Sequence, residues 1–286
     1  MSGKVVLITG ASSGIGAATA LRMAAAGFVV YAAARRVDRM ADLRAHGIKI
    51  IGLDVTSEDS ITACLQTIRQ ESGGIDVLVN NAGYGSYGAV EEVLMDDARR
   101  QFEVNLFGLA RLTQQVIAHM REQRWGRIIN VSSVGGVGAT PYGAWYHATK
   151  FALEGYSTAL RQELEPFGVD VVVIRPGGTK TEWGGIAMES LLKVSGNGPY
   201  KQAVQAMAAT FKKGNDSSML DSPDVIAKLI LQASTVARPK TVYVPASIAR
   251  IFVLIPWLLS HRMSNVLTRA FLGLPKVMGL ENGGAR

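Results

Sequence analysis

Tyr146 and Lys150 are the residues whose types and spacing most directly suggest catalytic chemistry. Residues four apart on a helix share one face. A free tyrosine has a pKa of about 10, and lowering it to about 7 requires the phenolate to be favoured by roughly 4 kcal/mol. A neighbouring ammonium, partly shielded from water, can supply that stabilisation. The same pair is also ordinary content of amphipathic helices, so its meaning depends on the elements that surround it.

A glycine-rich stretch follows the first apolar run, Val5–Thr9, and precedes a helical pattern. Its spacing is Gly-x-x-x-Gly-x-Gly, at Gly10, Gly14 and Gly16. The first glycine permits a tight turn, the second lets the backbone approach a pyrophosphate, and the third lets helix and strand pack closely. The helix N-terminus then offers N–H groups and a positive dipole end to the phosphates. An ordinary glycine-rich turn is the alternative, but the strand–loop–helix context favours a dinucleotide site.

The second apolar run ends in two arginines, Arg35 and Arg36, roughly twenty residues past the glycine loop, where the adenosine ribose is expected. A site that prefers NAD places an acidic residue there to bind the ribose 2′-hydroxyl. That acid is absent, and Asp38 lies too far into the next segment to replace it. A guanidinium suits a 2′-phosphate by charge and by forked geometry. We therefore predict NADP(H) as cofactor; for Arg36, a position facing solvent agrees with the sequence equally well.

Short apolar runs alternate with longer helical periods, which predicts an α/β protein. Most runs are apolar throughout, as parallel strands covered on both faces are. We predict a Rossmann-type doubly wound parallel sheet of about seven strands, with helices on both faces and residues 1–286 as a single domain. The expected strands are Val5–Thr9, Val29–Ala33, Lys49–Leu53, Val77–Asn80, Arg127–Val131, Asp170–Ile174 and Thr241–Val244. The expected helices are Gly16–Ala26, Ser57–Glu71, Asp96–Glu122, Tyr146–Pro166 and Ser222–Ser234.

Two regions depart from this alternation. Residues 181–221 form a long insert beyond the sixth strand, where lids and substrate pockets occur, so we expect a substrate lid there. Residues 246–286 form an apolar C-terminal extension, whose nine-residue run Ile251–Leu259 is too short to span a bilayer. We expect this run to pack against the pocket or the core, with a subunit contact as the second possibility and contact with a membrane surface as the third.

The segment Tyr146-His147-Ala148-Thr149-Lys150, with the glycine loop, resembles the short-chain dehydrogenase/reductase family over residues 4–245. Val-Gly-Gly after Ser133 and the long insert are similar to the 17β-hydroxysteroid and retinol dehydrogenase branch. The resemblance implies an oxidoreductase that interconverts a ketone or aldehyde and an alcohol by hydride transfer with NADP(H). Further motifs in family order and spacing are Asn80-Asn81-Ala82-Gly83, Asn105 in Val-Asn-Leu-Phe-Gly, Asn130-Val131-Ser132-Ser133 and Pro176-Gly177-Gly178-Thr179-Lys180-Thr181.

The resemblance also implies roles for particular residues. Tyr146 is the general acid or base, and Lys150 also holds the nicotinamide ribose hydroxyls. Ser133, thirteen residues before the tyrosine, holds the substrate oxygen, whereas Ser132 is expected to bond the backbone. Asn105 positions a water behind the lysine; a buried asparagine that bonds the main chain is the alternative. The implied cofactor contacts are Gly10, Ser12, Ser13, Gly14, Ile15, Gly16, Arg35, Arg36, Asp54, Val55, Asn81, Ala82, Gly83, Tyr146, Lys150, Pro176, Gly177, Thr179 and Thr181.

The substrate pocket is predicted at the loops beyond the carboxyl ends of the strands. Apolar and aromatic side chains there suit a medium-to-large apolar substrate that is steroid-, retinoid-, lipid- or aryl-ketone-like. Several of them could instead pack the lid, and His147 could face the substrate or be an inert helix residue. The predicted substrate-binding residues are Ser133, Val134, Tyr142, Trp145, Tyr146, Trp183 and Met188, with Gly135, Tyr84, Tyr87 and Leu192 as further candidates.

Composition narrows the class of protein. Of the 286 residues, 48% are apolar and 19% are charged, as in globular enzymes. The net charge is +7, but the basic residues are spread along the chain, so we expect a small-molecule carbonyl or alcohol substrate rather than nucleic acid. The lone cysteine, Cys64, is predicted to pack in a helix and favours a cytoplasmic location. The four histidines lack paired ligand spacing, so no metal is expected.

Two alternatives to a reductase stay open. The same site could work mainly as an alcohol-oxidising dehydrogenase, because the sequence does not set the direction. A protein of a different class, a non-catalytic regulator that senses NADP, could be built on the same fold. Such regulators typically lose the tyrosine or the lysine, and this chain keeps Ser133, Tyr146, Lys150 and Asn105. We expect a homodimer or a homotetramer.

Overall fold

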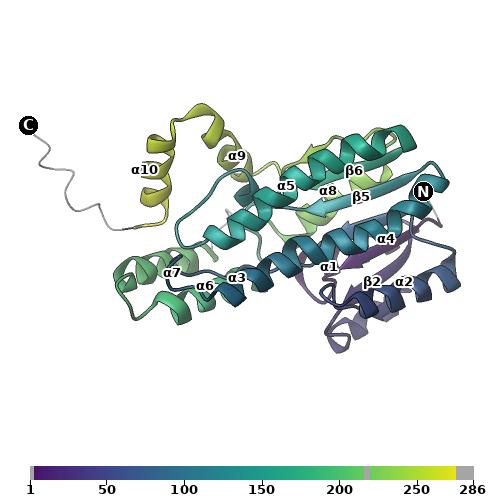
Figure 1. Ribbon diagram of the computed structural model, residues 1–286, viewed down its shortest axis with the longest axis horizontal. Helices are drawn as coiled ribbons and strands as arrows, with labels where there is room; N and C mark the ends of the chain where they lie inside the picture. Colours follow the sequence, from purple (N-terminus) through teal and green to yellow (C-terminus); the bar gives the residue numbers. More distant parts are fainter. Residues whose placement is uncertain (1–2, 216–219, 275–286) are drawn as a thin grey trace, which may run out of the picture.

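The computed structural model describes residues 3–215 and 220–274 of the chain. Within these ranges, a seven-stranded parallel sheet runs in the order β3-β2-β1-β4-β5-β6-β7, with helices on both faces (Figure 1). The predicted doubly wound sheet is confirmed, and each predicted strand is present with ends that differ by at most one residue. The strands are β1 (Val5–Thr9), β2 (Val29–Ala34), β3 (Lys49–Gly52), β4 (Val77–Asn80), β5 (Gly126–Val131), β6 (Val169–Ile174) and β7 (Val242–Tyr243).

The helices include short 3-10 and π segments, labelled η, between the longer α-helices. They are α1 (Gly14–Ala25), η1 (Asp38–His46), α2 (Glu58–Ser72), α3 (Met95–Phe102), η2 (Glu103–Gly108), α4 (Leu109–Glu122), η3 (Val134–Gly136), α5 (Ala144–Leu164), η4 (Glu165–Phe167), α6 (Glu182–Ser195), α7 (Lys201–Asn215), α8 (Pro223–Thr235), α9 (Ala249–Leu258) and α10 (His261–Phe271).

Both faces of the sheet are covered, which explains why its strands are apolar throughout. Along β1, Val6 and Ile8 point into a core that α1 and α8 cover. Val5 and Leu7 point the opposite way, into a core that α2, α4 and α5 cover. Cys64 of α2 is buried in this second core, and burial raises the pKa of its thiol to about 12. The prediction that this cysteine packs in a helix is confirmed.

The strand order reverses beside β1, because β2 and β3 lie on one side of it and β4 on the other. A reversal of this kind opens a crevice at the carboxyl ends of the strands. The loop after β1 meets the loop after β4 there: the backbone N–H groups of Asn81 and Ala82 both donate to Thr9 Oγ1 at 3.0 Å. The glycine loop and the Asn80–Gly83 motif therefore share one edge of the sheet.

The predicted helix Asp96–Glu122 is confirmed as one helical run over Met95–Glu122. It contains a π-helical turn, η2, between α3 and α4, and the backbone stays helical through both junctions. Gly108 ends that turn against the backbone of Val55, where an added Cβ would collide with the Val55 carbonyl oxygen. A π turn takes an extra residue and changes the direction in which side chains point. Asn105 lies inside the turn and is buried.

The insert at 181–221 contains two helices, α6 and α7, that the sequence pattern did not predict. Thr181 is the N-cap of α6, since its Oγ1 accepts a hydrogen bond from the Trp183 N–H at 3.4 Å. Figure 1 places both helices at one end of the molecule, together with the start of α5. The insert is therefore an ordered pair of helices near the carboxyl ends of the strands.

The C-terminal extension forms the helices α9 and α10, whose Phe252 and Phe271 rings meet edge to face at 5.1 Å. Ala249 and Leu272, at the two ends of this hairpin, are buried. Within the run Ile251–Leu259, the side chains of Ile251, Leu254, Trp257 and Leu258 are exposed, so the predicted packing against pocket or core does not cover this side of α9. Among the described helices, none combines the length and the apolarity that crossing a membrane requires.

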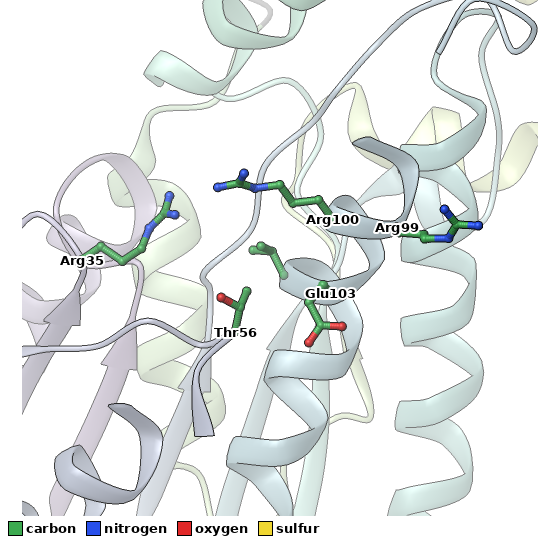
Figure 2. Close-up of a pocket in the computed structure, with 6 residues that line it drawn as sticks. Arg35, Thr56, Arg99, Arg100 and Glu103 are labelled. Carbon is green, nitrogen blue, oxygen red and sulfur yellow. The ribbon is translucent and has the colours of Figure 1, made fainter. Parts of the chain in front are cut away.

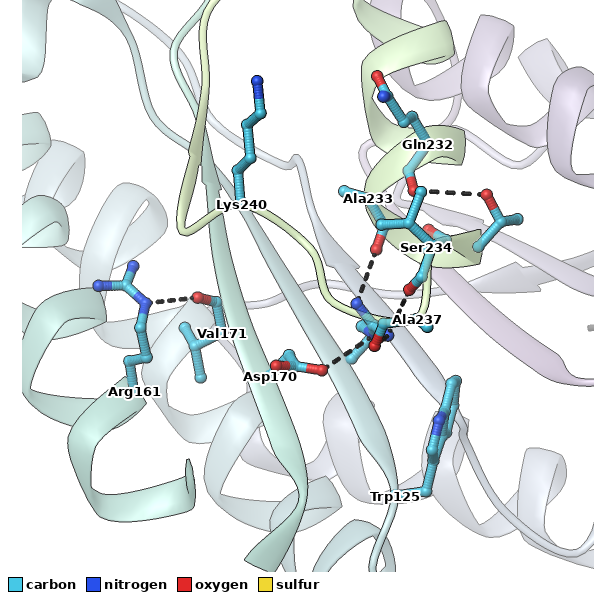
Figure 3. Close-up of polar contacts among 12 residues, drawn as sticks. Trp125, Arg161, Asp170, Val171, Gln232, Ala233, Ser234, Ala237 and Lys240 are labelled. Atoms are coloured by element: carbon cyan, nitrogen blue, oxygen red, sulfur yellow. Dashed lines mark hydrogen bonds and ion pairs between the residues drawn. The ribbon is translucent and has the colours of Figure 1, made fainter. Parts of the chain in front are cut away.

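A buried arginine fixes the sheet at the end opposite the crevice. Arg127, near the start of β5, is 1% exposed and donates to the Ala233 carbonyl at 3.1 Å and the Val236 carbonyl at 2.8 Å. Its Nε lies 3.4 Å from a carboxylate oxygen of Asp170. Figure 3 shows Asp170, Ala233 and Ala237 converging there. Carbonyls at a helix C-terminus carry partial negative charge, so this cation caps α8 and ties it to β5.

Candidate active site

Tyr146 and Lys150 lie in the first turns of α5, and each is only 7% exposed. The Lys150 Nζ donates to the carbonyl of Val131, the last residue of β5, at 2.9 Å. A Cβ added to Gly83 would lie 3.8 Å from the same Nζ, so the loop after β4 passes close to the lysine. The predicted pair is thus held where β5, α5 and the loop after β4 meet.

Ser133 comes directly after β5 and is the N-cap of η3. Its Oγ accepts a hydrogen bond from the Gly135 N–H at 2.9 Å. The Ser133 hydroxyl also acts on the nearby Tyr146 phenol in the direction that lowers the pKa of Tyr146, against the larger effect of burial. Ser132 lies against Gly136 instead, and its Oγ has no hydrogen-bond partner in the described part of the chain. The structure therefore brings Ser133 rather than Ser132 to the tyrosine, and Ser132 does not make the side-chain bond to the backbone that we expected.

Burial dominates the protonation of the pair. It raises the pKa of Tyr146 to about 12, against the lowering effect of Ser133. It lowers the pKa of Lys150 to about 8, against the raising effect of Glu154. The tyrosine shift is opposite to the sequence-based expectation, because both side chains are desolvated and the ammonium is hydrogen-bonded to the Val131 carbonyl. In this state Tyr146 is a protonated phenol, ready to donate.

Asn105 joins the loop after β4 to α5. Its Oδ1 accepts from the Tyr84 N–H at 3.0 Å, and its Nδ2 donates to the Tyr84 carbonyl at 2.9 Å and to Thr149 Oγ1 at 3.1 Å. The amide is therefore occupied at both ends by protein partners. The structure shows the buried asparagine that bonds the main chain. The implied role of positioning a water behind the lysine is compatible with these bonds and stays a prediction.

The glycine loop has the shape that a diphosphate needs. Gly10 and Gly14 adopt φ angles of +67° and +54°, which residues with a side chain rarely adopt. A Cβ on Gly14 would come 2.9 Å from Thr181 Cγ2, so the last residue of the Pro176–Thr181 motif lies against the loop. Ser13 is the N-cap residue of α1, with Ser12 before it and Ile15 behind it in the helix. The predicted loop residues and Thr181 are therefore brought together.

The rest of the Pro176–Thr181 motif is held by its own backbone contacts. The Pro176 carbonyl accepts from the Val134 N–H at 2.9 Å, which ties the motif to η3 beside Ser133. Gly177 lies against Ala249, at the start of α9. Thr179 Oγ1 donates to the Gly177 carbonyl at 3.2 Å. The motif thus links the serine, the glycine loop and the C-terminal hairpin.

A cavity of about 360 Å³ lies at the carboxyl end of β2 and beside α3. Arg35 and Arg100 extend their guanidinium groups toward one another across it, with Thr56 below them, whereas Arg99 points away (Figure 2). Neither Arg35 nor Arg100 has a hydrogen bond or an ion pair with another described residue. Two unpaired cations that face each other are poised to hold an anion between them. The remaining lining residues are Arg99, Glu103 and Val104.

Asp54 is hydrogen-bonded to Thr56, which lines this cavity. Its Oδ1 accepts from the Thr56 N–H at 2.9 Å and from Thr56 Oγ1 at 2.7 Å. Burial acts to raise the pKa of Asp54, but the Thr56 hydrogen bonds and the charges of Arg35 and Arg100 outweigh it and leave the pKa below its usual value. Of the two predicted adenosine residues, Asp54 is thus near enough to feel the charge of Arg35, and Val55 follows it along the chain. Arg36 does not line the cavity; its charge acts on Glu182 instead.

An aromatic and aliphatic cluster surrounds the Tyr146 ring. The ring centroid of Trp183 lies 5.0 Å from it, and that of Tyr87 lies 5.9 Å from it. Tyr142, in the loop before α5, adopts a positive φ of 64° and packs edge to face on Tyr200 at 5.9 Å. The phenol of Tyr146 is therefore enclosed by side chains of the lid. Other members of this cluster are Ala187, Met188, Leu191, Val204, Met207 and Leu272.

Two predicted pocket residues lie elsewhere or have another role. Trp145 lines a separate cavity of about 370 Å³ between α5, α3 and η2, away from the Tyr146 cluster. His147 is buried; its Nε2 accepts from the Thr140 N–H at 3.0 Å, and its Nδ1 lies 3.0 Å from the Gly135 carbonyl. The histidine therefore ties the loop 135–140 to α5. Of the two alternatives for His147, this arrangement agrees with a structural residue of the helix that does not face the substrate.

Arg100 is the residue that sequence reasoning missed. It lies in the region expected to be one long helix, where an arginine ordinarily faces solvent. It lies on α3, and Figure 2 shows its guanidinium directed toward that of Arg35. The position of Arg100 relative to the family motifs gives no indication in the sequence that it lines this cavity.

Comparison with known proteins identifies the family. A family model described as short chain dehydrogenase matches residues 4–189. The chain belongs to this family. It is 39% identical over 181 residues to a 3-ketodihydrosphingosine reductase of Bacteroides thetaiotaomicron, a match that covers 63% of this chain and 66% of that protein. It is 31% identical over 272 residues to an NADPH-dependent 3-dehydrocapnine reductase of Ornithobacterium rhinotracheale, covering 91% and 94%.

Solved structures agree with this assignment. A short-chain dehydrogenase from Streptomyces avermitilis superposes with a TM-score of 0.73 at 33% identity, and the match covers 88% of this chain and 91% of that one. As a short-chain dehydrogenase, the chain is an oxidoreductase that acts on an alcohol or carbonyl group with a nicotinamide cofactor. The glycine loop, Ser133, Tyr146 and Lys150 are the parts of its structure suited to that chemistry.

The buried Lys150 of this short-chain dehydrogenase is expected to make stability rise with pH. Its folded pKa of about 8 lies below its usual value of 10.5. Between these values the unfolded chain binds more protons than the folded one, so the free energy of unfolding increases with pH. We expect urea unfolding to show a gain of about 2 kcal/mol from about pH 7.5 to about pH 9.5, relative to Lys150→Met. If the free energy of unfolding changed with pH equally in the original chain and in Lys150→Met, this prediction would be contradicted.

Proposed function

We propose that this short-chain dehydrogenase uses NADP(H) to interconvert a ketone and an alcohol on an apolar, lipid-like substrate, mainly as a reductase. The observation that carries the cofactor choice is the pair of guanidinium groups, Arg35 and Arg100, that face one another across the cavity at the end of β2. No carboxylate stands at the end of β2, where an NAD-preferring site would place one.

The residues present fit a dinucleotide along the whole crevice. The positive φ of Gly10 and Gly14 leaves a cradle for the diphosphate, at the N-terminus of α1. Asp54 and Val55 would flank the adenine, and Arg35 and Arg100 would hold a 2′-phosphate by charge-assisted hydrogen bonds. Lys150 and Thr181 would hold the nicotinamide end. When bound, the cofactor supplies the hydride.

The side chains of the chain itself handle the proton. In reduction, Ser133 donates a hydrogen bond to the substrate carbonyl oxygen, where negative charge develops. Tyr146 transfers its phenolic proton to that oxygen as the carbonyl carbon accepts hydride, so the C=O π bond becomes one C–H and one O–H bond. The raised pKa of Tyr146, about 12, keeps this phenol protonated before the reaction. In alcohol oxidation the same steps run backwards.

An apolar substrate is supported by what encloses Tyr146. Trp183 and Tyr87 pack their rings beside the phenol, and Met188 belongs to the same buried apolar cluster. A lining of this kind favours an aliphatic or aromatic body with the carbonyl as its polar group. The names of two relatives agree with this proposal: one specifies a keto derivative of a sphingoid chain, and the other specifies NADPH.

The proposal is tested by steady-state oxidation of NADPH and NADH with methyl ketones of increasing chain length. We expect kcat/KM to rise with each added methylene, by roughly fourfold at first, because about 0.8 kcal/mol is gained for each CH₂ that is buried. Dihydroxyacetone serves as the polar control and should react poorly. Faster turnover of that control, or equal use of NADH, would overturn the substrate or cofactor assignment. NADPH binding without any turnover would favour the regulator alternative.

A further inference from the structure

The hairpin of α9 and α10 turns apolar side chains to solvent. On α9, Trp257 is 82% exposed and Leu258 is 75% exposed. On α10, four apolar residues at helical spacing share one face and are between 48% and 62% exposed. These four are Met263, Val266, Leu267 and Phe271. A soluble chain rarely leaves such a continuous apolar surface in water unless something binds there.

The polarity of α10 is inverted relative to an ordinary surface helix. Ser264 and Thr268, which are polar, are less exposed than Val266 and Leu267, which are apolar. Ser260 caps the start of this helix, since its Oγ accepts from the Met263 N–H at 3.4 Å. A well-formed helix whose apolar face points outward is adapted to a partner that is itself apolar.

The charges of the hairpin suit an anionic partner. Residues 249–271 contain three arginines and one histidine but no aspartate or glutamate. Arg250 and Arg262 are both exposed. Tryptophan and arginine are the side chains that commonly sit at the boundary between lipid and water, beside an embedded apolar face. Basic residues next to an apolar helix face add electrostatic attraction to anionic headgroups.

A second copy of the chain fits this surface poorly. In a two-fold symmetric contact the same patch meets itself. The arginines of one hairpin would then face those of the other, and the patch offers no carboxylate to pair with them. A lipid surface with anionic headgroups satisfies both the apolar face and the cations. The helices are too short to span it, so they would lie in its plane.

The hairpin is physically joined to the active site. Leu272, at the end of α10, is buried in the same cluster as Tyr146 and Met188. The Thr210 side chain of α7 donates to the Leu272 carbonyl at 3.2 Å. At its start, Ala249 packs on Gly177 of the motif after β6. Figure 1 shows α9 and α10 at the same end of the molecule as α6 and α7. The exposed face therefore lies next to the elements that enclose the phenol.

We propose that α9 and α10 dock flat on an anionic lipid surface and place the lid over the bilayer. From the sequence, contact with a membrane surface was the third possibility for this segment, after packing on the pocket or core and after a subunit contact. The outward apolar face favours the membrane surface over the other two. Where it concerns substrate entry, the inference rests on the proposed function: an apolar ketone dissolved in the membrane would reach Tyr146 without crossing water.

Vesicle sedimentation of the full chain tests the docking without substrate or cofactor. We expect at least about tenfold stronger binding to vesicles of phosphatidylcholine with phosphatidylglycerol than to phosphatidylcholine alone. W257S/V266S should lose most binding to either vesicle, and R250Q/R262Q should lose the preference for anionic lipid. V90S/L94S, which removes exposed apolar side chains elsewhere, is the matched control and should bind as the original chain does. Equal binding by W257S/V266S, or no binding by the original chain, overturns the proposal.

Two further measurements separate the possible outcomes. If light scattering shows that W257S/V266S converts an oligomer into a smaller species, a second copy covers the hairpin and the lipid proposal is wrong. Turnover of a short, water-soluble methyl ketone should be unchanged in W257S/V266S, which shows that the variant is folded. Vesicle binding without reduction of any apolar ketone would overturn the proposed substrate but leave the docking surface standing. Reduction of apolar ketones without vesicle binding would overturn the docking surface but leave the proposed substrate standing.

Discussion

Replacing Tyr146 with phenylalanine is expected to lower kcat by about a thousandfold or more while leaving the NADPH dissociation constant within about twofold. The phenol is the proton donor, and its neighbour Ser133 can orient the substrate oxygen but holds no proton of suitable acidity. The ring itself stays packed between Trp183 and Tyr87, so the fold loses only one hydroxyl. Stopped-flow or steady-state NADPH oxidation measures kcat, and NADPH fluorescence measures binding.

The matched control for this variant is Tyr156→Phe on the same helix. Tyr156 is partly buried in the core of the opposite end of α5, where its hydroxyl interacts with Thr113. It should keep kcat within about threefold, because surface and core hydroxyls far from the site change stability rather than chemistry. If Tyr146→Phe kept more than a tenth of the original kcat, the proton would come from another group and the mechanism would have to be abandoned.

The parts of this protein that sequence predicted well are those fixed by local rules. The β-branched runs determine the strands, because a parallel sheet buried on both faces admits few other residues. The glycine loop is predictable because Gly10 and Gly14 need positive φ angles that other residues rarely adopt. The spacing of Ser133 to Tyr146 is likewise determined by one strand end and one helix start.

The parts that sequence missed depend on packing between distant segments. The π turn at η2 arises where Gly108 meets the backbone of Val55, a contact that helical periodicity cannot reveal. Arg100 becomes a candidate ligand only because α3 packs beside the carboxyl end of β2 and brings it to the cavity that Arg35 lines. The pKa of Tyr146 was expected near neutrality from Lys150 alone, but the enclosing lid raises it. The inverted face of α10 was invisible for the same reason: apolar periodicity predicts a face, not the direction in which it points.

Arg35→Ala and Arg100→Ala are each expected to raise the KM for NADPH by roughly 10- to 100-fold, with little change in the KM for NADH. A charge-assisted hydrogen bond to a phosphate contributes about 1.5–3 kcal/mol, which corresponds to that range. The two guanidinium groups face one cavity from different elements, where both could contact a 2′-phosphate. NADH has no such phosphate, so removing either arginine should leave the KM for NADH unchanged. Steady-state kinetics with both cofactors measures the change in preference.

Arg99→Ala is the control that this cavity itself provides, since Arg99 is the neighbour of Arg100 and points away from Arg35 (Figure 2). It should leave both KM values within about twofold, as exposed surface substitutions do.

Because Arg35 and Arg100 would share one phosphate, the NADPH binding free energy lost in the double variant should be smaller than the sum of the losses in the two single variants. The double variant should unfold about as readily as the original chain, because the relief of repulsion between the two cations is offset by the loss of their attraction to Asp54. An unchanged NADPH preference in Arg100→Ala would leave Arg35 as the sole phosphate ligand, and an unchanged preference in both would exclude this cavity as the 2′-phosphate site.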